Sequence, residues 1–223
     1  METISLQLSG HPVWLSGFRL SDGSSLARQR TQVWISADEH ALTVAFLCND
    51  RDPWGTMTRR GDPVWQEECV ELFLAPGDSD PTTYFEFEIS PLGTLFEARI
   101  HNPSGRRADM RADTDWRCEG ISWHAALLPE QEAWSADLVI PWASLGLERP
   151  LPRIWRANLY RIDRPRDGMP PEFSCWLPTY QTPANFHVPS HFGRWELTPA
   201  SRRKPAGPPM SEEKAAEMAA TVW

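Results

Sequence analysis

The segment from Val64 to Leu74, V-W-Q-E-E-C-V-E-L-F-L, holds the residues whose types point most directly to chemistry. Side chains alternate along a strand, so Val70, Leu72 and Leu74 would lie on one face, and Glu71 and Phe73 on the other. An acid within an apolar strand needs a partner, and Arg99 or Arg161 from another strand could supply it. Alternatively, Trp65 and Glu71 could hold a sugar, because an indole face stacks on C–H groups while a carboxylate accepts hydroxyl hydrogen bonds. Both interpretations fit the spacing.

Glu86 and Glu88 lie two residues apart among aromatic residues of another predicted strand, so they share a face. A solvent-exposed polar face is the usual arrangement, and we expect it here. A catalytic alternative is that either acid forms with Glu71 the carboxylate pair that glycoside hydrolysis needs. Other catalytic signatures are absent from the sequence, which has no G-x-S-x-G, no glycine-rich phosphate loop and no H-E-x-x-H. The sequence therefore favours a protein that is not an enzyme, with no catalytic residue.

The sequence carries no spacing typical of a metal or cofactor site. Its four cysteines are scattered without a C-x-x-C, which is typical of buried thiols, although a disulfide between Cys48 and Cys69 stays open as an alternative. Asp50 and Asp52, in N-D-R-D-P, favour a capped turn over calcium ligation. We predict no metal ligand and no cofactor, with calcium as the alternative.

Short segments with alternating apolar residues recur between Pro, Gly, Asp and Asn clusters, and this pattern predicts strands. Because each strand buries one face and the connections are too short for helical crossovers, the sequence predicts an all-β fold, a two-sheet antiparallel β-sandwich of the immunoglobulin or jelly-roll kind. The clearest strands are Thr31–Ser36, Ala41–Asn49, Cys69–Ala75, Thr83–Ser90, Leu95–His101, Ile121–Leu128, Ala133–Ile140, Ile154–Ile162 and Phe192–Leu197, and weaker ones are Ile4–Leu8 and Phe173–Leu177.

The composition changes after Pro199. Residues 1–199 are predicted to form the sandwich, in which only Pro141–Leu147 resembles a helical turn. Residues 200–223 are predicted to form a linker followed by a short C-terminal helix, with Ser211 as its N-cap.

Charge and hydropathy exclude several classes of partner. The 223 residues include 22 Lys and Arg against 30 Asp and Glu, a net charge of -8, which disfavours nucleic acid and anionic membrane surfaces. No apolar run is long enough to span a bilayer. The N-terminus carries an acid where a signal peptide needs positive charge, so we expect a cytoplasmic location by default.

The chain contains twelve Trp, more than one core of this size needs. Trp54 and Trp176 border proline-rich loops and are candidates for a binding rim. Four others lie within strand patterns and are predicted to be core or sheet-covering residues: Trp34, Trp123, Trp134 and Trp155.

Several motifs, in order, resemble the family 9 carbohydrate-binding modules, within the wider group of DOMON-like sandwiches. They are T-Q-V-W-I-S-A-D, A-L-T-V-A-F-L-C-N-D, V-W-Q-E-E-C-V-E-L-F-L, T-Y-F-E-F-E-I-S-P-L-G-T, W-S-A-D-L-V-I-P-W, W-R-A-N-L-Y-R-I-D and F-H-V-P-S-H-F-G-R-W-E-L, and they cover Thr31 to Leu197. The resemblance implies a β-sandwich that binds the ends of sugar chains between two Trp side chains. Acid, amide and Arg groups would form hydrogen bonds with the sugar hydroxyls. Structural calcium accompanies some members.

Carried over by position, the resemblance assigns the first stacking Trp to Trp65 and its acid to Glu71. The second Trp is replaced by Phe186, and the Arg on the following strand by Glu88, which reverses the charge. The amide residue of the family corresponds to a position near Tyr160. Asn158 on the same strand is retained, and His187 adjoins the expected pocket. The predicted ligand is a mono- or oligosaccharide, and the predicted ligand-binding residues are Trp65, Glu71, Glu88, Asn158, Tyr160, Phe186 and His187.

Two other functions stay open. Some DOMON domains hold a b-type haem for electron transfer through a Met and a His or Lys. Met57, Met110 and Met169 are available for this, with His101 or His187. A glycoside hydrolase that uses Glu71 with Glu86 or Glu88 ranks last.

Overall fold

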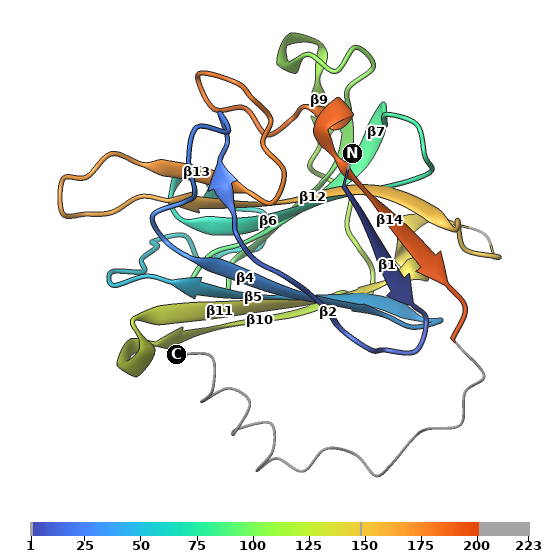
Figure 1. Cartoon of the computed structure of the whole chain (residues 1–223), viewed down its shortest axis with the longest axis horizontal. Coiled ribbons are helices and arrows are strands. Elements are labelled where there is room, and N and C mark those ends of the chain that lie inside the picture. The colour runs from blue at the N-terminus through green and yellow to red at the C-terminus, as the bar shows by residue number, and fades with distance from the viewer. Residues whose placement is uncertain (1, 148, 201–223) are drawn as a thin grey trace.

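The computed structural model describes residues 2–147 and 149–200, which form two facing β-sheets (Figure 1). The strands are β1 (Thr3–Gln7), β2 (Val13–Leu15), β3 (Arg19–Leu20), β4 (Thr31–Ala37), β5 (Ala41–Asn49), β6 (Cys69–Pro76), β7 (Thr83–Ile89), β8 (Leu95–His101), β9 (Arg111–Asp113), β10 (Ser122–Leu128), β11 (Ala133–Pro141), β12 (Ile154–Asp163), β13 (Glu172–Cys175) and β14 (Gly193–Thr198). Short 3-10 helices are η1 (Val64–Gln66), η2 (Arg107–Asp109), η3 (Pro129–Gln131), η4 (Trp142–Leu145) and η5 (Pro189–His191).

The larger sheet has the order β1-β14-β12-β6-β7-β8-β9, with β13 beside β12 and β3 beside β13. The smaller sheet has the order β10-β11-β5-β4-β2. This arrangement confirms the predicted two-sheet sandwich. One edge pair departs from the antiparallel arrangement, because β1 runs parallel to β14 with Thr3 opposite Arg194.

The predicted strands are confirmed, with ends that shift by at most two residues. Three short strands, β2, β3 and β9, were not predicted. The predicted helical turn in 141–147 is the 3-10 helix η4. The predicted linker and C-terminal helix lie almost entirely outside the described residues and stay predictions. Within the described ranges, no helix is long and apolar enough to cross a membrane.

The main hydrophobic core lies between the sheets. Strand β5 shows the expected alternation, with Leu42, Val44, Phe46 and Cys48 buried and the residues between them half-buried. Strand β6 differs because its first seven residues are buried on both faces. Its inner face contributes to the main core, and its outer face lies beneath loops.

A second apolar cluster covers the outer face of the larger sheet. Phe73 of β6 and Tyr84 of β7 pack there against Phe192, with ring centroids 6.0 Å and 5.3 Å from it. Phe186 and Phe192 come from the segment before β14 and join residues of β6, β7, β8 and β12. The outer face of this sheet is therefore a second interior, which is where the polar residues of interest lie.

The tryptophans divide between core and surface. Trp134 and Trp155 are buried in the main core, and Trp34 is half-buried with its ring 4.4 Å from that of Trp14. Trp123 packs against the core and donates its indole N–H to the Gly93 carbonyl at 3.0 Å. The expectation that Trp176 belongs to a binding rim is wrong, because it is buried between the sheets.

Candidate ligand-binding pocket

A cavity of about 430 Å³ opens on the outer face of the larger sheet. Its volume lies in the range of small-molecule sites. Acidic residues of β6 and β7 and aromatic residues from several elements line it together. The lining residues are Trp65, Glu71, Glu86, Glu88, Phe96, Arg107, Met110, Ala112, Thr114, Ile162, Arg164, Phe173, Ala184, Phe186 and His187.

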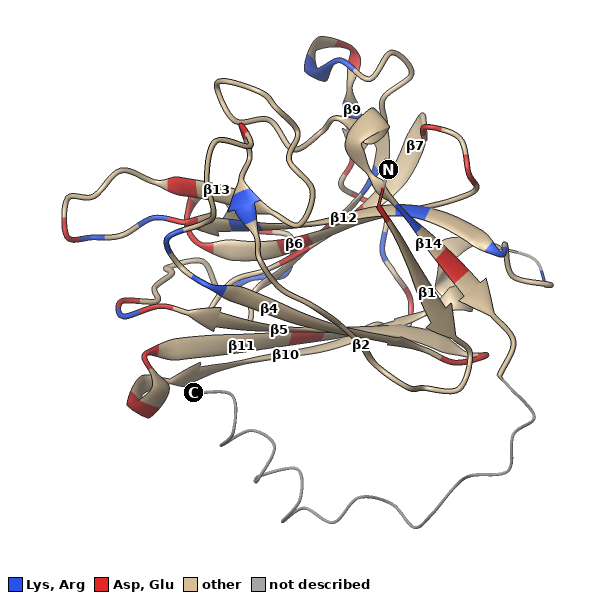
Figure 2. Ribbon diagram, in the orientation of Figure 1, with Lys and Arg blue, Asp and Glu red and all other residues tan. Residues whose placement is uncertain are grey.

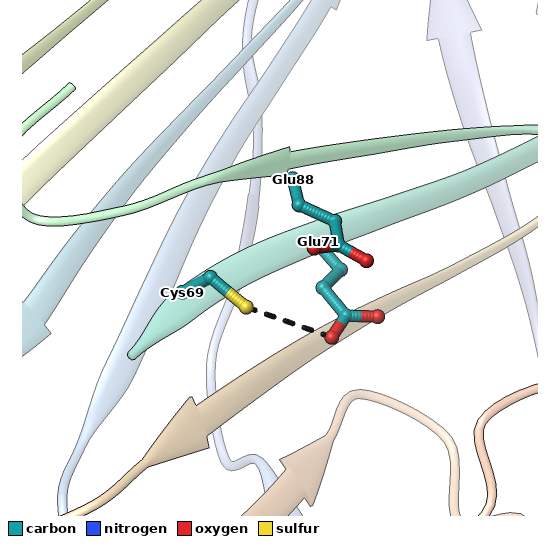
Figure 3. A group of neighbouring side chains, drawn as sticks. All are labelled: Cys69, Glu71 and Glu88. Atoms are coloured by element: carbon teal, nitrogen blue, oxygen red, sulfur yellow. Dashed lines mark hydrogen bonds between the residues drawn. The ribbon is translucent and has the colours of Figure 1, made fainter. Parts of the chain in front are cut away.

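Strand register brings the three acids together. Glu71 of β6 lies directly opposite Glu88 of β7, and Glu86 lies two residues before Glu88 on the same face. Figure 3 shows Glu71 and Glu88 side by side, with Cys69 on the same strand as Glu71. The Cys69 thiol donates a hydrogen bond to Glu71 Oε1 at 3.6 Å. Acidic residues thus occur within strands as well as on loops (Figure 2).

All three carboxyl groups are buried, with residue exposures of 3% for Glu71, 5% for Glu86 and 1% for Glu88. Burial raises the pKa of each group above its ordinary value, and the charge of neighbouring acids raises the pKa of Glu71 and of Glu88 further. Glu88 Oε2 is buried and has no hydrogen-bond partner in the part of the chain that the structure describes. The carboxyl groups therefore retain protons at higher pH than a surface glutamate does.

These positions correct two expectations. The solvated face predicted for Glu86 and Glu88 is wrong, because loops cover this side of the sheet. Neither predicted arginine pairs with Glu71. Arg161 points into the main core and bonds Asp50 Oδ2 at 2.8 Å, and Arg99 bonds Asp113 Oδ2 at 2.8 Å.

Aromatic side chains form the walls of the cavity. Trp65 lies in η1, just before β6, and its ring meets Phe96 of β8 edge to face with centroids 4.6 Å apart. Phe186 stacks on Tyr160 with centroids 4.3 Å apart and an interplanar angle of 17°. The Tyr160 hydroxyl also donates to the Phe186 carbonyl at 3.0 Å. Strand β12 therefore fixes the loop that carries Phe186.

His187 is held in place beside the acids. Its Nδ1 lies 2.9 Å from the Tyr84 hydroxyl, and its Nε2 lies 3.8 Å from Glu86 Oε1. Burial, together with the charge of Arg107, lowers the pKa of His187 to about 3. The imidazole is therefore neutral near pH 7 and brings no positive charge to the three glutamates.

Five of the seven predicted ligand-binding residues line the cavity: Trp65, Glu71, Glu88, Phe186 and His187. The other two are not among the lining residues. Tyr160 carries Phe186, and Asn158 bonds the backbone of Leu177 through Nδ2 at 2.9 Å and Oδ1 at 3.1 Å. Trp54, a rim candidate, is not a lining residue and donates its indole N–H to the Arg164 carbonyl at 2.7 Å.

The predicted ligand-binding set omits several lining residues, including Phe96, Arg107 and Phe173, and it omits Glu86, which the sequence suggested only as a catalytic partner of Glu71. The alternation of β7 does place Glu86 on the face of Glu88, and Phe96 lies opposite Glu88 in β8. Those two could have been found from strand pairing. Arg107 and Phe173 come from segments whose position the sequence pattern does not indicate.

A second buried acidic cluster lies elsewhere in the described structure, where calcium would be the candidate ion. Oxygens of Asp50, Glu68 and Asp163 lie within 4.8 Å of one another. The Arg161 guanidinium already contacts Asp50, and Glu68 accepts backbone N–H groups of Trp54 and Arg164 at 3.1 Å. An arginine thus supplies the positive charge that calcium would bring, so these residues do not fit the ion.

The fold and the pocket together define a class: a two-sheet β-sandwich whose larger sheet carries an acidic cavity with aromatic walls. Comparison with known proteins makes this specific. The sequence profile described as carbohydrate-binding family 9 matches residues 28–197. An extracellular protein of Arthroderma benhamiae is 32% identical over 176 residues, which are 73% of this chain and 76% of that protein. The chain belongs to carbohydrate-binding family 9.

Solved structures share the fold at low sequence identity. A Bacteroides uniformis structure, described as that of a candidate carbohydrate-binding protein, aligns with a TM-score of 0.69 at 15% identity over 88% of this chain and 99% of that one. A family 9 module of Caldicellulosiruptor kristjanssonii in complex with glucose aligns with a TM-score of 0.59 at 13% identity over 92% and 100%. Its complex with cellotriose gives a TM-score of 0.58 at 14% identity over 93% and 100%.

Proposed function

We propose that this protein binds a mono- or oligosaccharide, without cleaving it, between Trp65 and Phe186. The observation that carries the proposal is the convergence of these two aromatic residues and buried carboxyl groups on one cavity of about 430 Å³. Aromatic faces stack on the C–H surface of a sugar ring, and carboxyl groups bond its hydroxyls. The glucose and cellotriose complexes of the Caldicellulosiruptor module support a sugar as the ligand.

Calorimetric titration with glucose, cellotriose and a panel of other saccharides tests this proposal. We expect Trp65→Ala to weaken binding by roughly tenfold or more, because it removes one stacking face. Trp14→Ala is the matched control, since Trp14 is 47% exposed and lies on the other sheet. Silence across the panel, or equal affinity in the wild type and Trp65→Ala, would contradict the proposal.

The raised pKa values of the acids favour binding over hydrolysis. Carboxylate oxygens of Glu71 and Glu88 lie within 4.8 Å of each other, and the pKa of both groups is raised, chiefly by burial. A retaining glycosidase needs an ionised nucleophile about 5 to 5.5 Å from its acid, and an inverting enzyme needs a wider gap for water. We expect no turnover of chromogenic glycosides; turnover that Glu71→Gln abolishes would establish a hydrolase instead.

The haem alternative has less support. Tyr84 lies between its candidate ligands in the pocket, with its hydroxyl 2.9 Å from His187 Nδ1 and 4.0 Å from Met110 Sδ. A phenol therefore occupies the space that iron would need between them. We expect the purified protein to show no Soret absorbance, and a Soret band would reopen this alternative.

A further inference from the structure

The pocket contains more acid than its neighbours neutralise. Within residues 2–147 and 149–200, neither Glu71 nor Glu88 has a cationic group within 4.0 Å, and Glu86 has only His187, at 3.8 Å. His187 is neutral near pH 7 because burial lowers its pKa to about 3. The polar groups that β6 and β7 present to the pocket side of the sheet are thus acids, a thiol and a phenol, none of which carries positive charge.

The two arginines that line the cavity do not compensate for these acids. Arg164 donates to the Glu67 and Trp65 carbonyls at 3.0 Å and 3.3 Å, and its guanidinium lies 5.3 Å from the centre of the Phe173 ring. Arg107 is exposed on η2 and forms no ion pair within 4.0 Å with any of the three glutamates in the described structure. It lowers the pKa of Glu71 and of Glu86 only as a secondary influence against burial.

An unpartnered oxygen points to a ligand that donates hydrogen bonds. Among residues 2–147 and 149–200, no hydrogen-bond partner reaches the buried Glu88 Oε2, although Glu88 lines the cavity. A buried acceptor left unpaired is unfavourable. A hydrogen bond that the ligand donates to it therefore contributes more binding free energy than one made at the surface. A sugar hydroxyl donates one hydrogen, whereas an ammonium group donates three and also carries the charge that ionised carboxylates require.

The aromatic walls favour the same ligand. Trp65 and Phe96 lie beside Glu88, since Phe96 is its direct neighbour across β7 and β8 and Trp65 packs on Phe96. Aromatic faces attract cations, and Trp does so most strongly. Carboxyl groups on the floor and aromatic rings on the walls form a site for an organic cation.

We propose that the saccharide bound by this pocket is an amino sugar, whose protonated amine lies among Glu71, Glu86 and Glu88. This inference rests on the proposed sugar-binding function and narrows its ligand class.

Proton release is a consequence of this assignment. Burial and mutual proximity raise the pKa values of the carboxyl groups, so the empty pocket holds protons. A bound ammonium group stabilises the ionised forms, and the carboxyl groups then lose protons to the buffer. A neutral sugar of the same shape leaves those protons in place.

A metal ion is the competing cation, since Cys69 Sγ and oxygens of Glu71 and Glu88 lie within 4.8 Å of one another (Figure 3). Thiol ligation needs the thiolate. Burial and the neighbouring Glu71 raise the pKa of Cys69 well above its ordinary value, which keeps the thiol protonated and donating to Glu71. An open cavity with aromatic walls also suits an organic ligand better than an ion.

The test is calorimetric titration of the full chain with glucosamine, glucose and N-acetylglucosamine near neutral pH. Each sugar is measured in two buffers of different ionisation enthalpy. We expect glucosamine to bind at least roughly tenfold more tightly than the two neutral sugars. Its apparent enthalpy should change between buffers in the sense of proton release, while the enthalpy of a neutral sugar should not change.

The outcomes separate the two proposals. If glucose or N-acetylglucosamine binds as tightly as glucosamine, the amine assignment is wrong and the sugar-binding function stands. If no saccharide of the panel binds, the proposed function fails and the amine assignment fails with it. Tight binding of Zn²⁺ alone that blocks glucosamine would replace the amine assignment with a metal site.

Glu88→Gln provides the matched variant, because it keeps the shape of the side chain and removes its ability to ionise. We expect it to reduce the preference for glucosamine over glucose by roughly tenfold, with affinity for glucose changed by less than about threefold. Glu119→Gln, at an exposed turn residue that does not line the cavity, should leave both affinities unchanged. An unaltered preference in Glu88→Gln would overturn the proposal.

Discussion

At the scale of single residues, the pocket is defined by acids placed where a sheet would ordinarily place apolar groups. Like charges directly opposite each other on neighbouring strands are destabilising, and Glu71 and Glu88 are such a pair. The arrangement is tolerated because burial and proximity keep protons on the carboxyl groups. The fold thus carries a local cost that a ligand can relieve.

This cost makes stability depend on pH. The folded-state pKa values of Glu71, Glu86 and Glu88 lie above the unfolded value of about 4.3. The folded protein therefore holds more protons, and this contribution to stability is fully present below about pH 4.3 and is lost as pH rises through the folded pKa values. We expect the free energy of unfolding of the wild type to fall as pH rises from about 4.3 through the Glu86 pKa of about 7.

Urea unfolding of wild type and Glu88→Gln across that range measures the effect. Each unit of pKa difference corresponds to about 1.4 kcal/mol, so the variant should show a shallower slope. Burial raises the pKa of Glu68 to about 8, so this residue also lowers stability as pH rises. Its contribution is the same in wild type and variant and therefore cancels in the difference between their slopes. Identical slopes would show that Glu88 titrates normally.

At the scale of elements, the sheet supplies the floor of the pocket and a loop supplies one wall. The segment with Phe186 and His187 precedes η5 and β14, and it is fixed to the sheet through Tyr160 and Tyr84. Tyr160 of β12 therefore positions the aromatic wall at Phe186, although Tyr160 does not itself line the cavity. A side chain one layer behind the site should affect ligand affinity.

Tyr160→Phe tests this positioning role. The variant keeps the ring that stacks on Phe186 and loses the hydroxyl that donates to its carbonyl. We expect the free energy of unfolding to drop by about 0.5 to 1.5 kcal/mol, and sugar affinity to weaken in calorimetry while the fold is retained. Tyr180→Phe, at a residue 64% exposed, is the control and should change neither quantity. Unchanged affinity in Tyr160→Phe would mean that Phe186 is held by packing alone.

At the scale of the whole molecule, a buried arginine connects the two sheets. Arg161 extends from β12 of the larger sheet to the end of β5 in the smaller one, where it donates to the Asn49 carbonyl at 2.9 Å and to Asp50 Oδ2 at 2.8 Å. Both charged partners are almost fully buried. Removal of one partner would leave the other buried and uncompensated.

Arg161→Met should therefore destabilise the protein by about 3 to 5 kcal/mol, the usual cost when one partner of a buried ion pair is removed. Thermal or urea unfolding measures the loss. Arg51→Met is the matched control, because Arg51 pairs with Glu132 on the surface, and its effect should stay below about 1 kcal/mol. Equal stability of the two variants would show that the buried pair contributes nothing to folding.

The sequence predicts the strands well and the site less completely. Alternation identifies strands such as β5 because one face is buried, whereas β2, β3 and β9 contain only two or three residues and show no period. Alternation also shows that Glu86 and Glu88 share a face, but not what covers it. The covering loop near residue 186 is about a hundred residues away in the sequence, so only the folded chain reveals that these acids are buried.

The parallel pairing of β1 and β14 has a practical consequence for attaching this protein to a surface. Strand β14 begins opposite the middle of β12, at Gly193, and runs toward Ile154, whereas Ile162 at the other end of β12 lines the pocket. A tether that follows Thr198 therefore leaves from the end of the sheet remote from the ligand. A tether that precedes Thr3 begins level with the start of β14, nearer the pocket. Immobilisation through the end of β14 should keep the entrance clear.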